Sequence, residues 1–134
     1  MSKSAFGREG ALWTISMLTI PKREPYLQQL LSSLASLGSR DRFEVTVVYN
    51  AATAEEPLVI EQRIRRMAPN LALRVYVNTT DPTIGGGRRV QLAVCRTPLI
   101  AFVDDDLTLH GDVFGALEEA LRTRALGIVG LPSY

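Results

Sequence analysis

Three adjacent carboxylates follow an apolar run in the last third of the sequence. Asp104, Asp105 and Asp106 come directly after residues 99–103 (LIAFV), which have the composition of a buried strand. Neighbouring carboxylates repel one another, and a hard cation such as Mg²⁺ or Mn²⁺ relieves that repulsion because it prefers oxygen ligands. In extended backbone Asp104 and Asp106 would face one ligand while Asp105 points elsewhere. The alternative is a polar turn whose aspartates cap the next helix or face water.

Three glycines and two arginines form the second candidate. Gly85, Gly86 and Gly87 are expected just before a helix, where backbone approaches a ligand closely and helix N–H groups are free for an anion. Arg88 and Arg89 add guanidinium groups suited to phosphate. The segment has neither the GxxxxGK[ST] frame of a P-loop nor the GxGxxG dinucleotide fingerprint. The alternative is a flexible loop followed by two solvated arginines.

Other polar residues carry weaker signals. Lys22 and Arg23 follow the first predicted strand, either reaching a phosphate or a base or lying solvated in a proline-rich turn. His110 lies near the acidic run, as a ligand, a proton carrier or an exposed residue. Cys95 is predicted to be a buried, inert thiol; as the only cysteine it cannot form an internal disulfide, which favours a reducing cytoplasm. One cysteine and one histidine also exclude a zinc site built from such ligands.

Apolar runs alternate with helical stripes along the chain, and these elements must position the candidates. Predicted strands cover residues 11–19, 43–49, 71–77, 99–103 and 126–129. Predicted helices cover residues 26–37, ending at Gly38, then 56–67 with Leu58, Ile60, Ile64 and Met67 as apolar positions, a stretch after the three glycines, and 111–124. Trp13 and the leucines from Leu27 to Leu37 are predicted to be core. This order predicts an α/β fold with a mainly parallel sheet and helices on both faces.

Ligands of parallel sheets bind at the carboxyl ends of the strands. That rule directs attention to Thr19–Arg23, Tyr49–Thr53, Asn78–Arg89 and Asp104–Asp106. The chain has 134 residues, 46% hydrophobic and 22% charged, which fits one domain over residues 11–134 after a disordered lead over residues 1–10. A net charge of +1 gives no sign of a nucleic-acid partner. No apolar run reaches the roughly 18 to 20 residues that span a bilayer.

The ordered set of motifs resembles the N-terminal part of family 2 glycosyltransferases. Residues 17–34 (MLTIPKREPYLQQLLSSL) resemble the family's opening strand, basic turn and YLxxLLxSL helix. Residues 85–106 (GGGRRVQLAVCRTPLIAFVDDD) resemble its glycine and arginine segment, short helix and strand ending in an acidic triplet, and residues 128–130 its later Val-Gly strand end. The resemblance implies a Rossmann-like, truncated GT-A nucleotide-diphospho-sugar transferase topology.

The resemblance also implies roles for the candidate residues. Asp104 and Asp106 would be the DxD pair, with Asp106 holding Mn²⁺ or Mg²⁺ and Asp104 contacting the ribose or the metal shell. Asp105, between the two, would also contact the nucleotide-sugar. Arg88 or Arg89 would reach the diphosphate. The implied partners are a nucleotide-diphosphate sugar donor and an unidentified acceptor.

The base pocket is implied to lie after the first two strands. Thr19, Pro21 and Arg23 would line it. The family's second strand usually ends in an aspartate that reads the base, whereas Tyr49 and Asn50 stand at those positions here. Asn50 can still hydrogen-bond a base, but this departure puts uracil specificity in question.

The family's acceptor half and general base usually follow the part that this chain resembles. No residue here matches that base, so no catalytic residue is predicted. Three interpretations stay open: a fragment, a domain completed by a partner chain or a second copy, and a non-catalytic binding or interaction module. A nucleotidyltransferase also fits, and would prefer a nucleoside triphosphate. A receiver domain fits poorly, because the first predicted strand ends in Thr19 and Asn78 follows the third.

Overall fold

A four-stranded parallel sheet is the centre of the molecule. The computed structural model describes residues 10–37, 42–51, 54–109 and 113–124. The strands β1 (Trp13–Thr19), β2 (Phe43–Asn50), β3 (Leu73–Asn78) and β4 (Leu99–Phe102) lie in the order β3-β2-β1-β4, and every pair is parallel. The helices are α1 (Glu24–Ala35), α2 (Pro57–Met67), α3 (Ile84–Ala93) and α4 (Val113–Arg124), with a short 3₁₀ turn, η1 (Pro21–Arg23), before α1.

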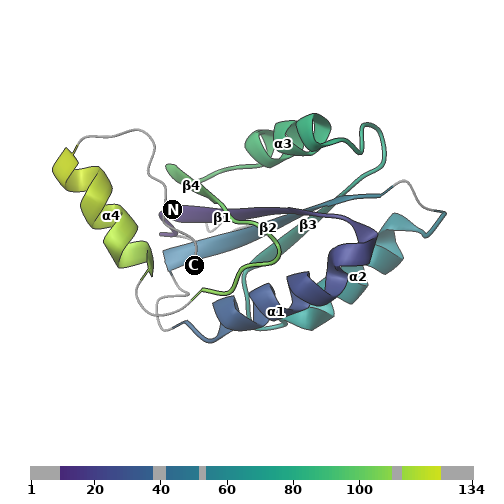
Figure 1. Ribbon diagram of the computed structural model, residues 1–134, viewed down its shortest axis with the longest axis horizontal. Helices are drawn as coiled ribbons and strands as arrows, with labels where there is room; N and C mark the ends of the chain where they lie inside the picture. Colours follow the sequence, from purple (N-terminus) through teal and green to yellow (C-terminus); the bar gives the residue numbers. More distant parts are fainter. Residues whose placement is uncertain (1–9, 38–41, 52–53, 110–112, 125–134) are drawn as a thin grey trace.

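Helices cover both faces of the sheet, as the sequence predicted. The helices α1 and α2 lie against one face and α3 against the other, while α4 lies at the end of the sheet where β1 begins (Figure 1). Trp13 of β1 is buried as predicted, and its indole Nε1 donates to Glu118 Oε1 of α4 at 2.8 Å, which joins the strand to the helix. None of the helices in the described ranges has the length and hydropathy needed to cross a bilayer.

The face that α1 and α2 cover is apolar. Side chains alternate along a strand, so every second residue of β1 and β2 points to these helices. The leucine stripe of α1 meets them, and each fully buried leucine contributes about 1.5 to 3 kcal/mol to folding. The predicted leucine core is therefore confirmed; its fully buried members, with their strand partners, are Leu27, Leu30, Leu31, Leu34, Ile15, Met17, Val45 and Val47.

The face under α3 buries several polar side chains. Glu44 is 2% exposed and its Oε1 accepts from Arg74 Nη2 at 2.7 Å. Gln91 of α3 is fully buried and its Nε2 donates to Ser16 Oγ at 2.9 Å. Thr46 and Arg74 are register partners on β2 and β3. Hydrogen bonds from Gln91 to Ser16 of β1 and from Arg74 of β3 to Val94 O therefore join α3 to the sheet, beside the buried Val48 of the same face.

Several predicted boundaries and exposures differ from the structure. The three glycines form the first turn of α3 instead of preceding it, because Thr83 caps the helix and its Oγ1 accepts from Gly86 N at 3.0 Å. Leu58 is 62% exposed, since α2 buries only the stripe of Ile60 and Ile64. Cys95 is partly exposed rather than buried. Four predictions fall outside the described residues: residues 1–9 of the predicted lead over 1–10, Gly38, His110 and the strand at 126–129.

The polar face yields a stability prediction. Thr46 Oγ1 is buried and has no hydrogen-bond partner among the described residues, whereas the equally buried Thr14 Oγ1 bonds Thr97 Oγ1 at 2.6 Å. We expect Thr46→Val to raise the free energy of unfolding by about 1 kcal/mol, because it removes a buried polar group that lacks a partner. Thr14→Val, the matched control, should lower it by about 1 kcal/mol. Urea unfolding measures both, and equal losses in the two variants would contradict the assignment.

Candidate functional site

The carboxyl ends of all four strands meet at one edge of the sheet. This follows from parallel pairing, which places Thr19 of β1 opposite Tyr49 of β2, and the next residue, Asn50, opposite Asn78 of β3. The acidic run follows β4 at the same edge (Figure 1). The structure therefore brings together the segments that the strand-end rule selected, apart from residues 52–53, which lie outside the described ranges.

The acidic run is a turn and not an extended segment. Val103 N donates to Ser16 O at 3.0 Å, and the chain then turns at Asp105 and Asp106, where Leu107 N donates to Asp104 O at 3.2 Å. Asp105 is 5% exposed, while Asp104 and Asp106 are exposed. The turn thus places two carboxylates at the surface on either side of a buried one.

Asp105 is held by Arg23 and Thr19. Arg23 Nε donates to Asp105 Oδ1 at 2.8 Å and to Oδ2 at 3.0 Å, and Thr19 Oγ1 donates to Oδ2 at 2.9 Å. Arg23 Nη2 also lies 3.3 Å from Asp106 Oδ2. The hydrogen bonds and charge of Asp105 raise the pKa of Arg23, so this guanidinium stays protonated. Three predicted donor-binding residues therefore bind one another in this structure.

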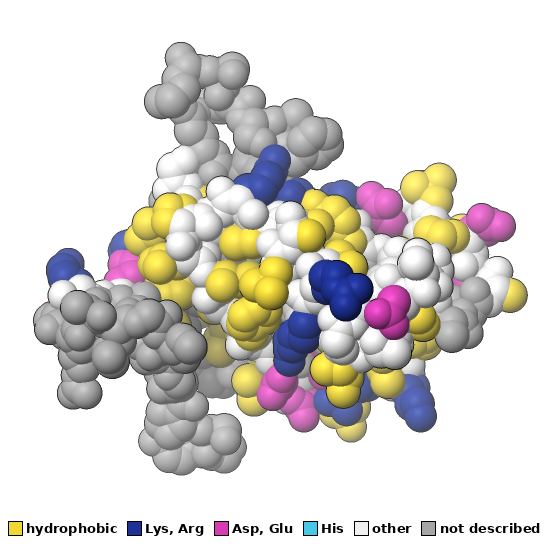
Figure 2. Space-filling model, turned by 90° about the horizontal axis from the view of Figure 1, so that it is seen from above, with side chains coloured by type: hydrophobic (Ala, Val, Ile, Leu, Met, Phe, Trp, Pro, Cys, Tyr) yellow, Lys and Arg dark blue, Asp and Glu magenta, His cyan; other side chains and the backbone are white. Residues whose placement is uncertain are grey.

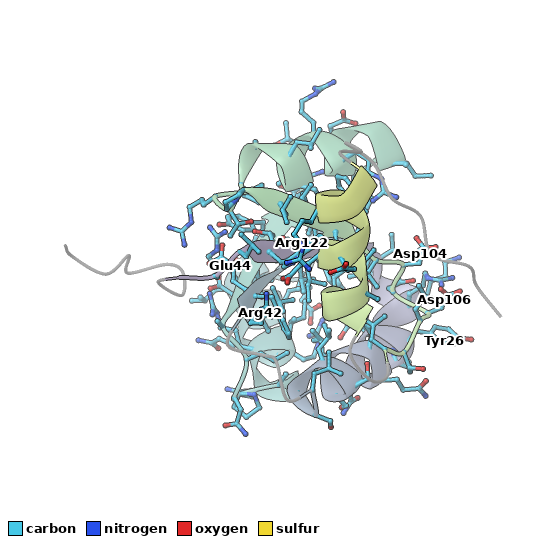
Figure 3. The ribbon with its side chains drawn as sticks, turned by 90° about the vertical axis from the view of Figure 1, so that its left-hand side faces the viewer. Tyr26, Arg42, Glu44, Asp104, Asp106 and Arg122 are labelled. Atoms are coloured by element: carbon cyan, nitrogen blue, oxygen red, sulfur yellow. The ribbon has the colours of Figure 1, made fainter. Side chains whose placement is uncertain are left out.

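An exposed aromatic ring lies beside this cluster. The guanidinium carbon of Arg23 is 5.3 Å from the centroid of the Tyr26 ring, which is 49% exposed. Asp104, Asp106 and Tyr26 lie on the same side of the molecule (Figure 3). The helical spacing predicts Tyr26 on the same apolar face as Leu27, but the side chain is exposed. Its exposure and its contact with Arg23 depend on how η1 turns the chain into α1. Pro21, another predicted residue of this segment, is exposed at the start of η1.

Asn50 ties the strands to the start of α3. It is 5% exposed; its Nδ2 donates to Thr83 O at 2.8 Å, and its Oδ1 accepts from Asn78 Nδ2 at 2.8 Å. Asn78 Nδ2 also donates to Asp81 O at 2.7 Å. Both polar atoms of the Asn50 amide thus have protein partners. The importance of Asn78 was missed because it depends on the register between β2 and β3, which the sequence does not show.

The two arginines of α3 differ in their surroundings. Arg88 Nη1 donates to Gln91 Oε1 at 2.9 Å, and its guanidinium carbon lies 5.2 Å from the centroid of the Phe102 ring, two residues before Asp104. Arg89 is exposed. On the outer surface of the α3 side of the molecule, hydrophobic side chains gather next to basic ones (Figure 2). Arg88 of α3 therefore lies beside Phe102, the last residue of β4, and β4 is the strand that leads into the acidic turn.

The donor groups at the turn are hard oxygen ligands. Asp104 and Asp106 offer two exposed carboxylates, which suit Mg²⁺ or Mn²⁺. Within the described ranges, no group of three or more His, Cys, Asp or Glu side chains is arranged to hold a metal ion. A cation at the turn would therefore need further oxygen ligands from a bound molecule or from water.

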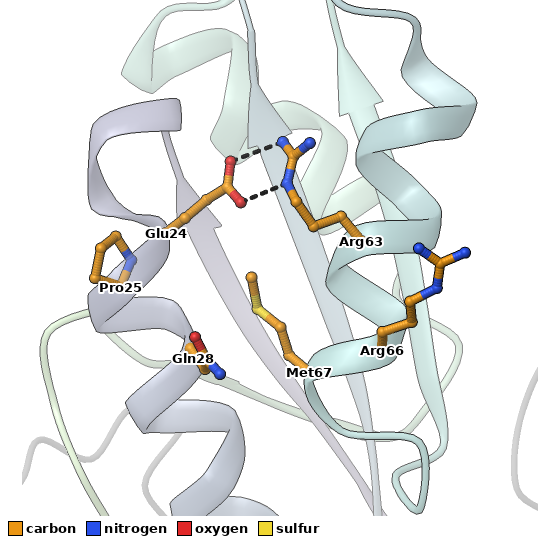
Figure 4. A pocket seen from close by; sticks show the side chains of 6 residues that line it. All are labelled: Glu24, Pro25, Gln28, Arg63, Arg66 and Met67. Carbon is orange, nitrogen blue, oxygen red and sulfur yellow. Dashed lines mark hydrogen bonds and ion pairs between the residues drawn. The ribbon is translucent and has the colours of Figure 1, made fainter.

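A hollow of about 380 Å³ lies between α1 and α2, on the opposite face of the sheet from α3 (Figure 4). Arg63 donates to both oxygens of Glu24, from Nε at 2.8 Å and from Nη2 at 2.9 Å. Tyr49 Oη donates to Glu24 Oε2 at 2.5 Å; burial, and then Glu24, raise the pKa of this phenol. Glu24 and Arg63 are thus paired with one another, which favours a structural role for this pair. It is lined by Glu24, Pro25, Gln28, Arg63, Arg66 and Met67.

Comparison with known proteins gives one family and one group of related folds. A family model described as Glycosyl transferase family 2 matches residues 18–133. The crystal structure of S. aureus TarS matches with 22% identity and a TM-score of 0.62, covering 90% of this chain and 23% of that one. TarS 1–349 in complex with UDP and with UDP-GlcNAc matches with 22% identity and a TM-score of 0.63, covering 91% of this chain and 38% and 37% of those chains. No curated protein matches.

The likeness to these structures shows the fold, since the identity is low. It agrees with the four-stranded parallel sheet and its covering helices. The chain spans less than two-fifths of the length of these TarS structures.

The first turn of α3 gives a sharp test of how this helix is seated. A Cβ added to Gly86 would lie 2.1 Å from the backbone oxygen of Asp81, whereas one added to Gly85 would meet nothing within 4 Å. We expect Gly86→Ala to lower the free energy of unfolding by about 1 to 3 kcal/mol, because backbone must move to make room. Gly85→Ala, the control, should be neutral or raise it by up to about 1 kcal/mol, because alanine favours helix. Equal effects in thermal unfolding would show that Gly86 is not packed this way.

The ion pair in the hollow predicts a pH dependence. Hydrogen bonds from Arg63 lower the pKa of Glu24 below its ordinary value of 4.5. A lowered folded-state pKa means that this pair stabilises the fold fully above that ordinary value and ceases to do so as the pH falls through the lowered one. We therefore expect wild type to exceed Glu24→Gln in stability near neutral pH, and the difference to shrink on acidification to about pH 3. Urea unfolding across this range measures it; a difference that does not change with pH would contradict the assignment.

Proposed function

The chain belongs to glycosyl transferase family 2, and on that premise we propose that the edge formed by Thr19, η1, the start of α3 and the acidic turn binds a nucleotide-diphosphate sugar for transfer to an acceptor. One observation carries the proposal: two exposed carboxylates, Asp104 and Asp106, stand at the end of β4 while Arg88 lies against the same strand. Crystal structures of the similar protein TarS in complex with UDP and UDP-GlcNAc support this class of donor.

Asp104 and Asp106 are the residues that we assign to a divalent cation. Both are exposed, both offer hard oxygen ligands, and both follow the same strand. Bound there, Mn²⁺ or Mg²⁺ would neutralise charge on the leaving diphosphate. The carboxylates would hold the cation at the strand end, and the diphosphate would supply the additional oxygen ligands that the turn itself does not.

We assign the positive charges of α3 to the diphosphate. Arg89 is exposed and Arg88 is positioned by Gln91 and Phe102, so both guanidinium groups can approach an anion from the α3 side. The base would lie toward Thr19 and η1, where Pro21 and Lys22 are exposed. Asn50 would act there through the backbone of Thr83 instead of reading the base, because both polar atoms of its amide already have partners.

The acceptor and the general base are not assigned to residues of this chain. We propose that the acceptor site and the general base are supplied by additional residues of a longer chain, by a partner protein or by a second copy. The TarS structures that share this fold are more than twice as long as this chain. The proton of the acceptor hydroxyl would pass to that base as the sugar is transferred.

A non-catalytic interaction module is the second candidate. It is favoured by the end of β2, where Tyr49 and Asn50 stand in place of the base-reading aspartate and both engage protein partners. This candidate keeps the fold and the family membership but binds no nucleotide.

Calorimetry with UDP and with GDP, in the presence and absence of Mn²⁺, separates the two candidates. We expect Mn²⁺-dependent binding of a nucleoside diphosphate that Asp104→Ala/Asp106→Ala weakens by about a hundredfold or more, because both assigned cation ligands are lost. Glu56→Ala is the control, since it removes an exposed carboxylate at the start of α2. Binding unchanged in the double variant would move the donor site away from the turn. No binding by a folded wild-type chain would favour the interaction module.

A further inference from the structure

We propose that Arg23, Asp105 and Thr19 form a positioning unit that holds the acidic turn, so that Asp104 and Asp106 are presented together to the cation and the donor. Neither Arg23 nor Asp105 then binds the donor directly. The inference rests on the proposed function for its purpose, while its geometry can be tested without any ligand.

The middle carboxylate of the acidic turn is buried. Asp105 is 5% exposed and lies between two exposed neighbours. A buried carboxylate is costly unless it is paired and hydrogen-bonded, and here both oxygens have partners. The partners come from β1 and η1, which are more than eighty residues away in sequence and are fixed by the centre of the sheet. Asp105 therefore fastens the turn to the rigid part of the fold.

The Arg23 side chain contacts three groups at once. Its Nε bonds Asp105, its Nη2 lies 3.3 Å from Asp106 Oδ2, and its guanidinium carbon is 5.3 Å from the centroid of the Tyr26 ring. One planar group thus connects the buried carboxylate, an exposed carboxylate and an aromatic ring. Lysine carries the same charge but lacks this fork, so Arg23→Lys separates geometry from charge.

The acidic turn concentrates negative charge. Three adjacent carboxylates repel one another, and Arg23 compensates part of that charge from inside the turn. A turn held in place before the ligand arrives loses less conformational freedom on binding, so affinity rises without any direct contact to the donor. Arg23 and Asp105 are on this account positioning residues.

Amide hydrogen exchange of the ligand-free protein is the first test. Leu107 N donates to Asp104 O and reports on the turn. We expect Arg23→Lys and Asp105→Asn each to speed exchange at Leu107 by about tenfold or more, since each removes charge-assisted hydrogen bonds, while β2 amides keep their protection. Lys22→Gln, at an exposed residue of η1, is the matched control and should leave the exchange rate at Leu107 unchanged. Unchanged exchange at Leu107 in folded variants would overturn the proposal.

Nucleotide affinity is the second test, by calorimetry with Mn²⁺ and the nucleoside diphosphate that wild type binds. We expect each variant to lose about tenfold in affinity and the double variant Arg23→Lys/Asp105→Asn to lose little more, because the two residues act as a unit. Full affinity in Asp105→Asn together with a loss in Arg23→Lys would mean that Arg23 contacts the donor itself, which would overturn the proposal.

The two tests distinguish a failure of the proposed function from a failure of the positioning unit. If wild type binds no nucleotide, the proposed function fails while exchange at Leu107 still decides whether the unit holds the turn. If either variant is unfolded by circular dichroism, Thr19→Val serves in its place, because it removes a single hydrogen bond to the same carboxylate. Faster exchange at Leu107 in that variant would support the unit, and unchanged exchange would overturn it.

Discussion

The parallel pairing of β1 with both β2 and β4 is the constraint on which the site depends. It aligns Trp13 with Phe43 and Leu99 at one end of the sheet and brings the ends of the strands together at the other. Thr19 can reach Asp105 because Val103 continues the pairing with Ser16 past the end of β4. An antiparallel partner would place its carboxyl end at the opposite edge, and the acidic turn would lie far from η1 and α3.

The two faces of the sheet contribute differently. The face under α1 and α2 is apolar, while the face under α3 also buries polar side chains, among them Glu44, Arg74, Ser16 and Gln91. Hydrogen bonds have directional requirements that apolar contacts lack, so they specify where α3 sits more closely than they stabilise it. That division suits a helix whose first turn and arginines must lie at a defined place beside the strand ends.

Sequence patterns predicted the fold because its strongest determinants are periodic. The leucine stripe of α1 and the apolar run of β2 predicted a helix and a buried strand, and both are present. The order of the elements then implied parallel pairing and the edge where the candidate site lies. Exposure near helix starts was predicted less well: Leu58 belongs to an apolar pattern yet lies outside the buried stripe of α2. The first turn of α3 was placed wrongly because glycine has a low helix propensity, which the cap at Thr83 overrides.

The candidate site shows why residue type alone does not assign a role. Arg23, Asp105 and Asn50 have the chemistry of ligand-binding residues, and the sequence cannot show that their polar atoms meet partners within the protein. Those partners depend on strand register and on the path of η1, which are properties of the packed chain. The same packing leaves Asp104 and Asp106 exposed. The proposed division between groups that hold this edge and groups that face a ligand thus rests on tertiary contacts, and it makes the buried Asp105 as important to Asp104 and Asp106 as the strand that precedes them.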